Sequence, residues 1–479
     1  MMMKNKYVYL VGFVFLTLSM LAQDAEKKKV LGRLSKLEST YSQIATKIWG
    51  FAEVGYKEKQ SAQLLQETLR QAGFSIESGV AGIPTSFVAT YGQGKPVIGI
   101  MAEYDALPGM SQDSIPTKRS IGASAGHACG HHLFGTASVA SAIAIRDWMK
   151  ETGQKGTIKL FGCPAEEGGS GKVYMVRDGV FAGADVMLHW HPNDVNSVSN
   201  TSSLANKTGK FRFYGLSSHA AASPDRGRSA LDAVEAMDHM ANMLREHVPQ
   251  TTRIHYVITN GGKAPNIVPD FAEVYYYVRS PQREIVEDVW GRLQKAAEGA
   301  ALGTGTRYEM ELIGGVYEML PNDVLASLMQ SNLQQVGGYI LNPMELAFAK
   351  QIQQTEGMRL VDLASTQSVS PGRPDPSSGG STDVGDVSWV VPTIGLGAAT
   401  WVPGTSAHSW QAVAAGGTSI GRKGMMVAAK TLTSTAMDLF KNPKLIEDAT
   451  AEWKKRTGES FKYKALLGQR KPALNYRDN

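Results

Sequence analysis

The segment Val97–Asp105 reads VIGIMAEYD and indicates the fold of this 479-residue chain. It is a short apolar run that ends directly in acidic residues, as expected for a buried strand that leads into a polar loop. Three similar runs lie at Thr85–Thr90, Thr157–Cys163 and Val186–Trp190, and an Ala-rich stretch with a helical pattern spans Thr136–Lys150. This alternation predicts an α/β fold with a mainly parallel sheet and helices on its faces.

A different pattern begins near residue 206. The segments there are a strand at Lys207–Tyr214, a helix at Ser229–His247, strands at Arg253–Asn260 and Phe271–Ser280, a helix at Pro281–Leu302 and a strand at Arg307–Ile313. The order β-α-β-β-α-β is that of a ferredoxin-like unit. We therefore expect residues 206–317 to form an inserted α+β lid, and residues 23–205 and 318–479 to form the α/β domain. The basic tail from Lys454 shows little pattern for a core.

Composition excludes several classes of protein. Hydrophobic residues make up 43% and charged residues 19% of the chain, which excludes wholesale disorder. The net charge of +5 is small for this length, and no basic stripe is interleaved with aromatic residues, so nucleic acid is not an expected partner. Two cysteines cannot build a disulfide framework.

The N-terminal residues 1–22 have the pattern of a secretory signal peptide. Lys4 and Lys6 precede an apolar run from Tyr7 to Ala22. That run is about 16 residues, shorter than the roughly 20 that a helix needs to span a bilayer. We expect a periplasmic or secreted protein with no membrane contact after cleavage; an uncleaved anchor is the alternative.

Most of the metal-ligating residue types gather in short clusters after predicted strands. The clusters are GHACGHH at Gly126–His132, AEEGG at Ala165–Gly169, HWHP at His189–Pro192 and EYD at Glu103–Asp105, with His408 in a late loop. In open parallel sheets, ligands bind at the carboxyl ends of the strands. Thiolate, imidazole and carboxylate are the ligands of zinc and its neighbours. Of two adjacent glutamates, one suits metal binding and the other proton transfer.

Two alternatives arise from the same stretches. Gly122–Gly126 matches the G-x-S-x-G elbow of serine hydrolases, with Ser124 as the nucleophile, but the residues before it lack the strand which that motif requires. Cys129 and Cys163 form a disulfide in the second alternative. The neighbouring histidines favour Cys129 as a ligand, whereas Cys163 ends an apolar strand.

The clusters resemble the M20 metallopeptidases, in their amidohydrolase branch. The matching motifs are DALPG at Asp105–Gly109, HACGH at His127–His131, PAEEGG at Pro164–Gly169 and SHAA at Ser218–Ala221. Further stretches at Gly380–Trp389, Pro403–Trp410 and Lys471–Asp478 resemble a subgroup concerned with aminobenzoyl-glutamate utilisation.

The resemblance implies roles for individual residues. Cys129, His131, Glu167, His191 and His408 would bind two divalent metal ions, zinc first, with manganese or cobalt as alternatives. Glu166 would be the general base, Asp105 would orient a ligand, and His219 would reach the site of a partner subunit. Asn266 and Arg279 would hold the carboxylate of the substrate. The partner would be a second copy or a related subunit.

The expected reaction is hydrolysis of the amide bond of a small N-acyl amino acid, with substrates like p-aminobenzoyl-glutamate favoured. An aminoacylase or dipeptidase of the same family, a non-catalytic metal-binding protein and the Ser124 hydrolase are the alternatives. His132 stands where the family has an acid, which leaves its role open. His189 competes with His191 for one ligand position, and the count from Asp185 favours His191.

Overall fold

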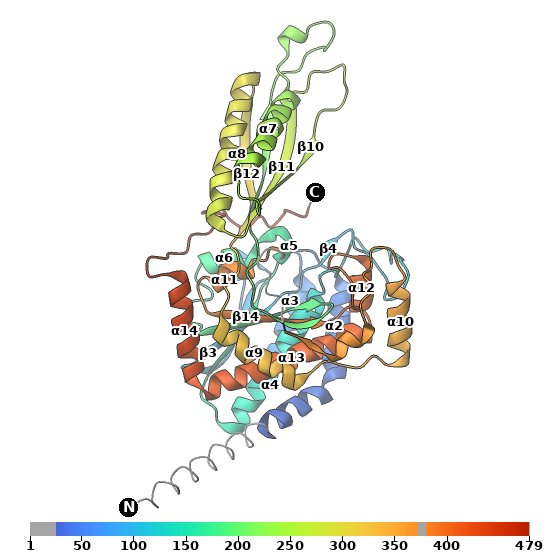
Figure 1. Ribbon diagram of the computed structural model, residues 1–479, viewed down its shortest axis with the longest axis vertical. Coiled ribbons are helices and arrows are strands. Elements are labelled where there is room, and N and C mark those ends of the chain that lie inside the picture. Colours follow the sequence, from blue (N-terminus) through green and yellow to red (C-terminus); the bar gives the residue numbers. More distant parts are fainter. Residues whose placement is uncertain (1–24, 372–379, 479) are drawn as a thin grey trace, which may run out of the picture.

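The computed structural model describes residues 25–371 and 380–478, so the predicted signal peptide at 1–22 lies outside the described residues. The chain forms a large α/β domain from which a smaller unit projects (Figure 1). Within the described ranges, no helix combines the length and the apolar character needed to cross a bilayer.

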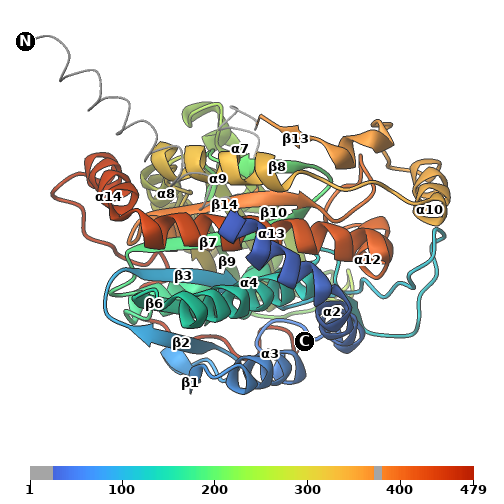
Figure 2. The ribbon, with the colours of Figure 1, turned by 90° about the horizontal axis from the view of Figure 1, so that it is seen from below.

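An eight-stranded mixed sheet is the centre of the large domain (Figure 2). Its strands, in spatial order, are β1 (Ser75–Ser78), β2 (Phe87–Gln93), β6 (Gly156–Gly162), β3 (Val97–Ala102), β7 (Val186–Asn193), β14 (Thr393–Ala399), β8 (Asn196–Ser199) and β13 (Val369–Ser370). The four central strands β6, β3, β7 and β14 run parallel, which confirms the predicted α/β class. The predicted strand β2 instead pairs antiparallel with β6.

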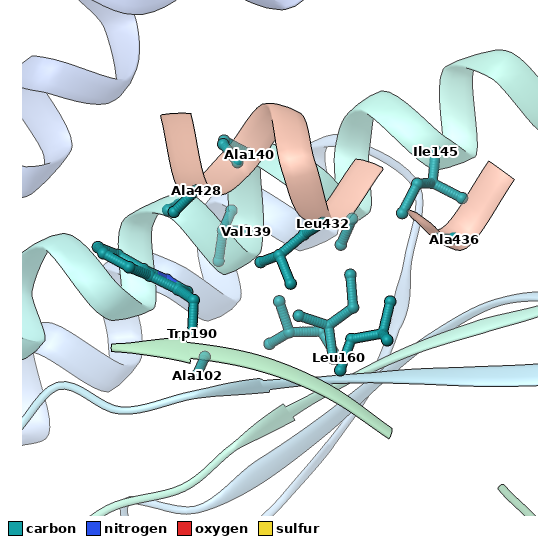
Figure 3. Packing of buried hydrophobic residues seen from close by; sticks show 14 of the residues in the cluster. Ala102, Val139, Ala140, Ile145, Leu160, Trp190, Ala428, Leu432 and Ala436 are labelled. Atoms are coloured by element: carbon teal, nitrogen blue, oxygen red, sulfur yellow. The ribbon is translucent and has the colours of Figure 1, made fainter. Parts of the chain in front are cut away.

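Helices cover both faces of this sheet. On one face lie α2 (Glu38–Phe51), α3 (Lys59–Gln71), α4 (His131–Thr152), α9 (Asp323–Val336) and α13 (Ser419–Lys441). On the other lie α6 (Gly171–Arg177) and α11 (Val384–Ser388), while α10 (Pro343–Gln353), α12 (Trp410–Gly416) and α14 (Pro443–Thr457) flank the domain. Small residues let the helices approach closely: Ala140 on α4 and Ala428 on α13 lie above Trp190 and Leu160 of the strands (Figure 3).

The projecting unit, which we call the lid, has the predicted β-α-β-β-α-β order. Its elements are β9 (Ala205–Tyr214), α7 (Ala230–Leu244), β10 (Arg253–Asn260), β11 (Phe271–Ser280), α8 (Arg283–Thr304) and β12 (Arg307–Val316). The four strands form an antiparallel sheet in the order β10-β11-β9-β12. Phe211, Tyr276 and Trp290 are buried between this sheet and its two helices. The lid therefore has a core of its own.

The C-terminal tail corrects one expectation. Residues after Lys454 were expected to contribute little to a core, yet Ala465, Leu466 and Leu467 are buried. Ala465 and Leu467 pack into the cluster beneath α6 and α11. The apolar group is too short to show a period, so only its tertiary neighbours reveal it.

Candidate active site

The predicted clusters meet in one cleft of about 720 Å³, within the range that accommodates small ligands. Glu103 follows β3, Glu166 and Glu167 follow β6, and His191 lies at the end of β7, so the carboxyl ends of three parallel strands contribute. The base of the lid forms the opposite wall through residues such as Asn206, Thr208, Tyr277 and Arg279.

The loop before α4 carries two candidate ligands on either side of a glycine. Gly130 has a φ of +80°, and a Cβ atom there would lie 2.7 Å from the Cβ of Pro192. Glycine alone tolerates both the left-handed backbone and this close approach. The turn lets Cys129 and His131 contribute to the same site.

Three donors, those of Cys129, His131 and His191, lie within 4.8 Å of one another. A second set, Cys129, Glu167 and His408, satisfies the same limit. The two sets share Cys129, so these residues would hold two cations at adjacent positions. Glu103, His131 and Glu166 form a further group beside them.

The donor atoms lie close together but do not satisfy one another by hydrogen bonds, as expected for atoms that bind a cation. His131 Nε2 lies 3.1 Å from Glu103 Oε2, and His408 Nε2 lies 3.1 Å from Glu167 Oε1. The buried atoms His131 Nε2, Glu103 Oε2 and Glu167 Oε1 nevertheless have no hydrogen-bond partner within the described chain. Polar atoms are rarely buried in this way unless something else satisfies them. A divalent cation would satisfy all three atoms.

The electrostatics support the same conclusion. Burial by itself would lower the pKa of His131, but Cys129, Asp105 and Glu103 raise it well above the ordinary value. The site therefore favours positive charge. Burial also raises the pKa of the Cys129 thiol, which favours its protonated form. A cation beside the sulfur would stabilise the thiolate, the form that binds metal.

The general-base candidate Glu166 lies among other carboxylates. Burial, followed by the charges of Glu103 and Glu167, raises its pKa well above the ordinary value. Lys172 limits this repulsion, because its Nζ lies 2.6 Å from both Glu103 Oε1 and Asp383 Oδ1. A carboxyl group with a raised pKa is suited to accept a proton and to release it again.

The backbone around the two glutamates is constrained. Ala165 and Ser170, which flank the Glu166–Gly169 turn, both have left-handed φ angles, of 56° and 57°. Such conformations are uncommon outside glycine and persist where the surroundings enforce them.

Two other histidines near the site have structural contacts. His127 Nε2 lies 3.0 Å from the Ile48 carbonyl, and His132 Nε2 lies 3.1 Å from the Gly416 carbonyl. Burial lowers the pKa values of both, so both are neutral. His132 therefore connects the start of α4 to the end of α12; the sequence had left its role open.

The structure places His191, and not His189, beside the other candidate ligands. His191 Nε2 lies 3.3 Å from Cys129 Sγ, and His191 belongs to a donor set. The His189 ring packs against the backbone of β14, where a Cβ on Gly395 would lie 2.3 Å from it. His189 lines the cleft but joins no donor set among the described residues.

The two alternatives from the sequence find no support. Cys129 and Cys163 are both free. Ser124 is exposed and precedes only the two-residue strand β5 (Ala125–Gly126), and within the described chain its hydroxyl bonds no histidine or acid. A nucleophile elbow requires a longer strand before the serine and a helix directly after it.

The predicted lid residues are separated by the structure. Arg279 lines the cleft from β11, stacked 5.2 Å from the ring of Tyr277. His219 and Asn266 are exposed in the neighbouring loops that follow β9 and β10. These loops lie at the end of the lid away from the large domain, its tip (Figure 1). The ten-residue β9 spans about 30 Å between the cleft and that tip. His219 and Asn266 of a chain therefore do not reach its own cleft in this conformation.

Four site residues escaped assignment from the sequence: Lys172, Asp383, Tyr476 and Arg477. Lys172 and Asp383 carry no spacing signal, because their partners are distant in the chain. Tyr476 and Arg477 stood in a recognised tail motif without a role. Their contacts with the Glu167 carbonyl, at 2.8 and 2.5 Å, appear only in the folded chain.

An α/β domain with paired glutamates and two metal-donor sets, and a separate ferredoxin-like lid, defines the class of metal-dependent amide hydrolases. The family profile of the M20 peptidase dimerisation domain matches residues 204–304. The chain is 42% identical over 440 residues to one of the subunits of p-aminobenzoyl-glutamate hydrolase from Escherichia coli, covering 86% of this chain and 91% of that protein.

Two further comparisons agree. The mouse Xaa-Arg dipeptidase is 29% identical, with 89% of this chain and 92% of that protein covered. A dinuclear metal-binding peptidase of the M20 family from Bacillus subtilis has the same fold, with a TM-score of 0.57 at 17% identity over 85% of this chain and 99% of that one. The chain belongs to the M20 peptidase family and is an amidohydrolase.

Proposed function

We propose that the chain hydrolyses N-aroyl amino acids of the p-aminobenzoyl-glutamate type with the help of two divalent cations. The observation that carries the proposal is the pair of donor sets that share Cys129, next to a base with a raised pKa. Support for the substrate comes from the relative whose name includes p-aminobenzoyl-glutamate, at 42% identity.

The residues of the chain would hold the cations in two places. Cys129, His131 and His191 would bind one, and Cys129, Glu167 and His408 the other. Thiolate, imidazole and carboxylate together favour zinc, with manganese or cobalt as alternatives. When bound, such ions lower the pKa of water and polarise a carbonyl oxygen.

Glu166 would move the proton. Its carboxylate accepts a proton from the attacking water and delivers it to the leaving nitrogen, so that amine and acid are the products. The Lys172 ammonium stays paired with Glu103 and Asp383. It thereby keeps the local negative charge low enough for Glu166 to ionise.

We propose that the tip of another lid completes each site. Ala221 N and Ala222 N donate to His219 Nδ1, at 3.2 and 3.1 Å, which places the ring proton on Nε2. His219 is thus a preformed donor for the oxygen that becomes negative during attack. Exposed apolar side chains on the lid, Met243, Val257 and Ile258, offer a surface for a second copy or a related subunit. The match to a dimerisation domain supports this assembly.

We also propose that the protein is exported to the periplasm or secreted. The support is the basic and apolar pattern of residues 1–22. Fractionation of cells, with N-terminal sequencing of the mature chain, tests this: a first residue near Gln23 is expected, and an intact N-terminus would contradict it.

A substrate panel tests the activity. The zinc-loaded protein is incubated with p-aminobenzoyl-glutamate, hippurate, N-acetyl-leucine and an Xaa-Arg dipeptide, and release of the free amine is measured. The highest kcat/KM is expected for p-aminobenzoyl-glutamate. A clear preference for the dipeptide would assign the chain to the dipeptidases instead.

A further inference from the structure

The C-terminal tail returns to the active site after leaving the domain surface. Beyond α14, residues 465–467 are buried, and Tyr476 and Arg477 then reach the turn that carries Glu166 and Glu167. The Tyr476 hydroxyl and Arg477 Nη2 both donate to the carbonyl oxygen of Glu167. The tail therefore holds this turn from outside and places a guanidinium group beside it.

The Arg477 guanidinium keeps unused hydrogen-bonding capacity. Its side chain lines the cleft, and its Nε is buried without a partner. In the part of the chain that the structure describes, no carboxylate lies within ion-pair distance of Arg477. Arg477 is partly exposed to the cleft, but its buried Nε lacks a hydrogen-bond partner, which is costly. A ligand carboxylate that binds the guanidinium would offset this cost.

The guanidinium of Arg279, on the lid side of the cleft, also lacks part of its hydrogen bonds. Its Nε is also buried without a partner, and no acid pairs with it among the described residues. Arg279 stacks 5.2 Å from the ring of Tyr277, so it approaches the cleft from β11, whereas Arg477 approaches it from the C-terminal tail. The cleft thus has two separate guanidinium groups for anions.

We infer that Arg477 is a specificity-determining residue that binds a second carboxylate of the substrate, the acidic side chain of an N-acyl glutamate or aspartate. Arg279 then binds the α-carboxylate that every N-acyl amino acid carries. Guanidinium and carboxylate match in a two-point geometry, and the Arg477 guanidinium lines the cleft without an acid among the described residues. This inference rests on the proposed amidohydrolase function and identifies the residue that selects the amino acid.

The test compares N-(4-aminobenzoyl)-glutamate with N-(4-aminobenzoyl)-glutamine, which has the same shape but no side-chain charge. Binding is measured by calorimetry in zinc-loaded Glu166→Gln protein, which does not need turnover, and hydrolysis is measured with Glu166 intact. Arg477→Gln should raise Kd and KM for the glutamate compound about 10- to 100-fold, the size of a lost hydrogen bond to a charged group. The glutamine compound should change by less than about 3-fold.

Three further variants separate the explanations. Arg279→Gln should weaken both compounds equally, because both carry the α-carboxylate. Lys471→Gln removes a charge from the same tail, at an exposed residue, and should leave the preference for glutamate unchanged. Tyr476→Phe removes the other contact with Glu167 and should affect both compounds alike.

Two outcomes would overturn the inference. If Arg477→Gln weakens the binding of both compounds equally, Arg477 only positions Glu167 and does not bind the side-chain carboxylate of the substrate. If it weakens neither, the cleft uses no second anion site. Failure of the proposed function looks different: the wild type would then hydrolyse neither compound, while the binding comparison would still report on Arg477.

Discussion

His131 Nδ1 lies 2.8 Å from Asp105 Oδ1, and both side chains are buried. The carboxylate keeps the ring proton on Nδ1 and directs Nε2 toward the donor set. The other oxygen of Asp105 accepts from the Glu167 amide at 2.9 Å. One carboxylate therefore orients a candidate ligand of each proposed cation. Burial would raise the pKa of Asp105, but the charge and hydrogen bond of His131 outweigh it and lower the pKa.

Asp105→Asn should weaken zinc binding about 10- to 100-fold, the usual cost of losing an orienting partner of a ligating histidine. Competition with a chromophoric chelator measures the affinity. Asp225→Asn, at an exposed acid of the lid, is the matched control and should bind zinc like the wild type. An unchanged affinity in Asp105→Asn would show that His131 needs no orienting carboxylate.

Glu166→Gln and Glu167→Gln should have different effects, although the residues are adjacent. Glu166→Gln should retain zinc and lose about 10²- to 10⁴-fold in kcat, because the proton acceptor is removed. Glu167→Gln should lose zinc itself, because Glu167 belongs to a donor set. Metal analysis of both purified variants decides the matter; equal metal loss would refute the division of roles.

Chelation should abolish hydrolysis, and added zinc, manganese or cobalt should restore it. The expectation follows from the buried donor atoms that have no hydrogen-bond partner in the described chain. Ser124→Ala is the control and should be fully active, because Ser124 lies exposed on a loop. Activity that survives chelation but not this substitution would point to the serine mechanism.

Mixing two inactive variants tests whether the lid tip acts in a partner's site. His219→Ala and Glu166→Gln proteins are combined and allowed to exchange subunits. With random exchange about half of the dimers are mixed, and each has one intact site of two, so about a quarter of the wild-type activity should return. Exchange is verified by mass spectrometry of the assemblies. If exchange occurs without recovery, His219 does not act in trans.

Asp386 belongs to none of the metal-donor sets, and its buried carboxyl group should make the stability of the fold depend on pH. Burial raises its pKa to about 7, although Tyr463 donates to it at 2.6 Å. The folded chain therefore holds a proton that the unfolded chain releases near pH 4, and this contribution to stability is lost as the pH rises from about 4 to 7.

Asp386→Asn should make the fall in melting temperature between pH 5 and pH 8 smaller. The asparagine is neutral at every pH and keeps an acceptor for the Tyr317 amide. Scanning calorimetry at several pH values measures the effect. Glu318, whose pKa burial also raises to about 7, leaves part of the slope in place. An identical slope in wild type and variant would show that Asp386 is ionised in the folded chain.

Much of the fold was predictable because its signals are local. The alternation of strand and helix around Val97–Ala102 identified the α/β class, and the order of elements after Asn206 identified the lid. The clusters at Cys129 and Glu166 converge because each adjoins the carboxyl end of a parallel strand. The antiparallel direction of β2 was not predictable, because an apolar run contains no information about the direction of its neighbour.

The sequence by itself determined which chemical groups are available and the order in which they follow the strands. The tertiary structure alone decided which of them meet. His189 and His191 are two residues apart in β7 and so point to the same face. The His189 ring packs against the backbone of Gly395, whereas the His191 ring lies beside Cys129. Arg477 joins the cleft across 310 residues of chain from Glu167. Periodicity acts over a few residues, whereas contacts across such separations depend on how whole elements pack.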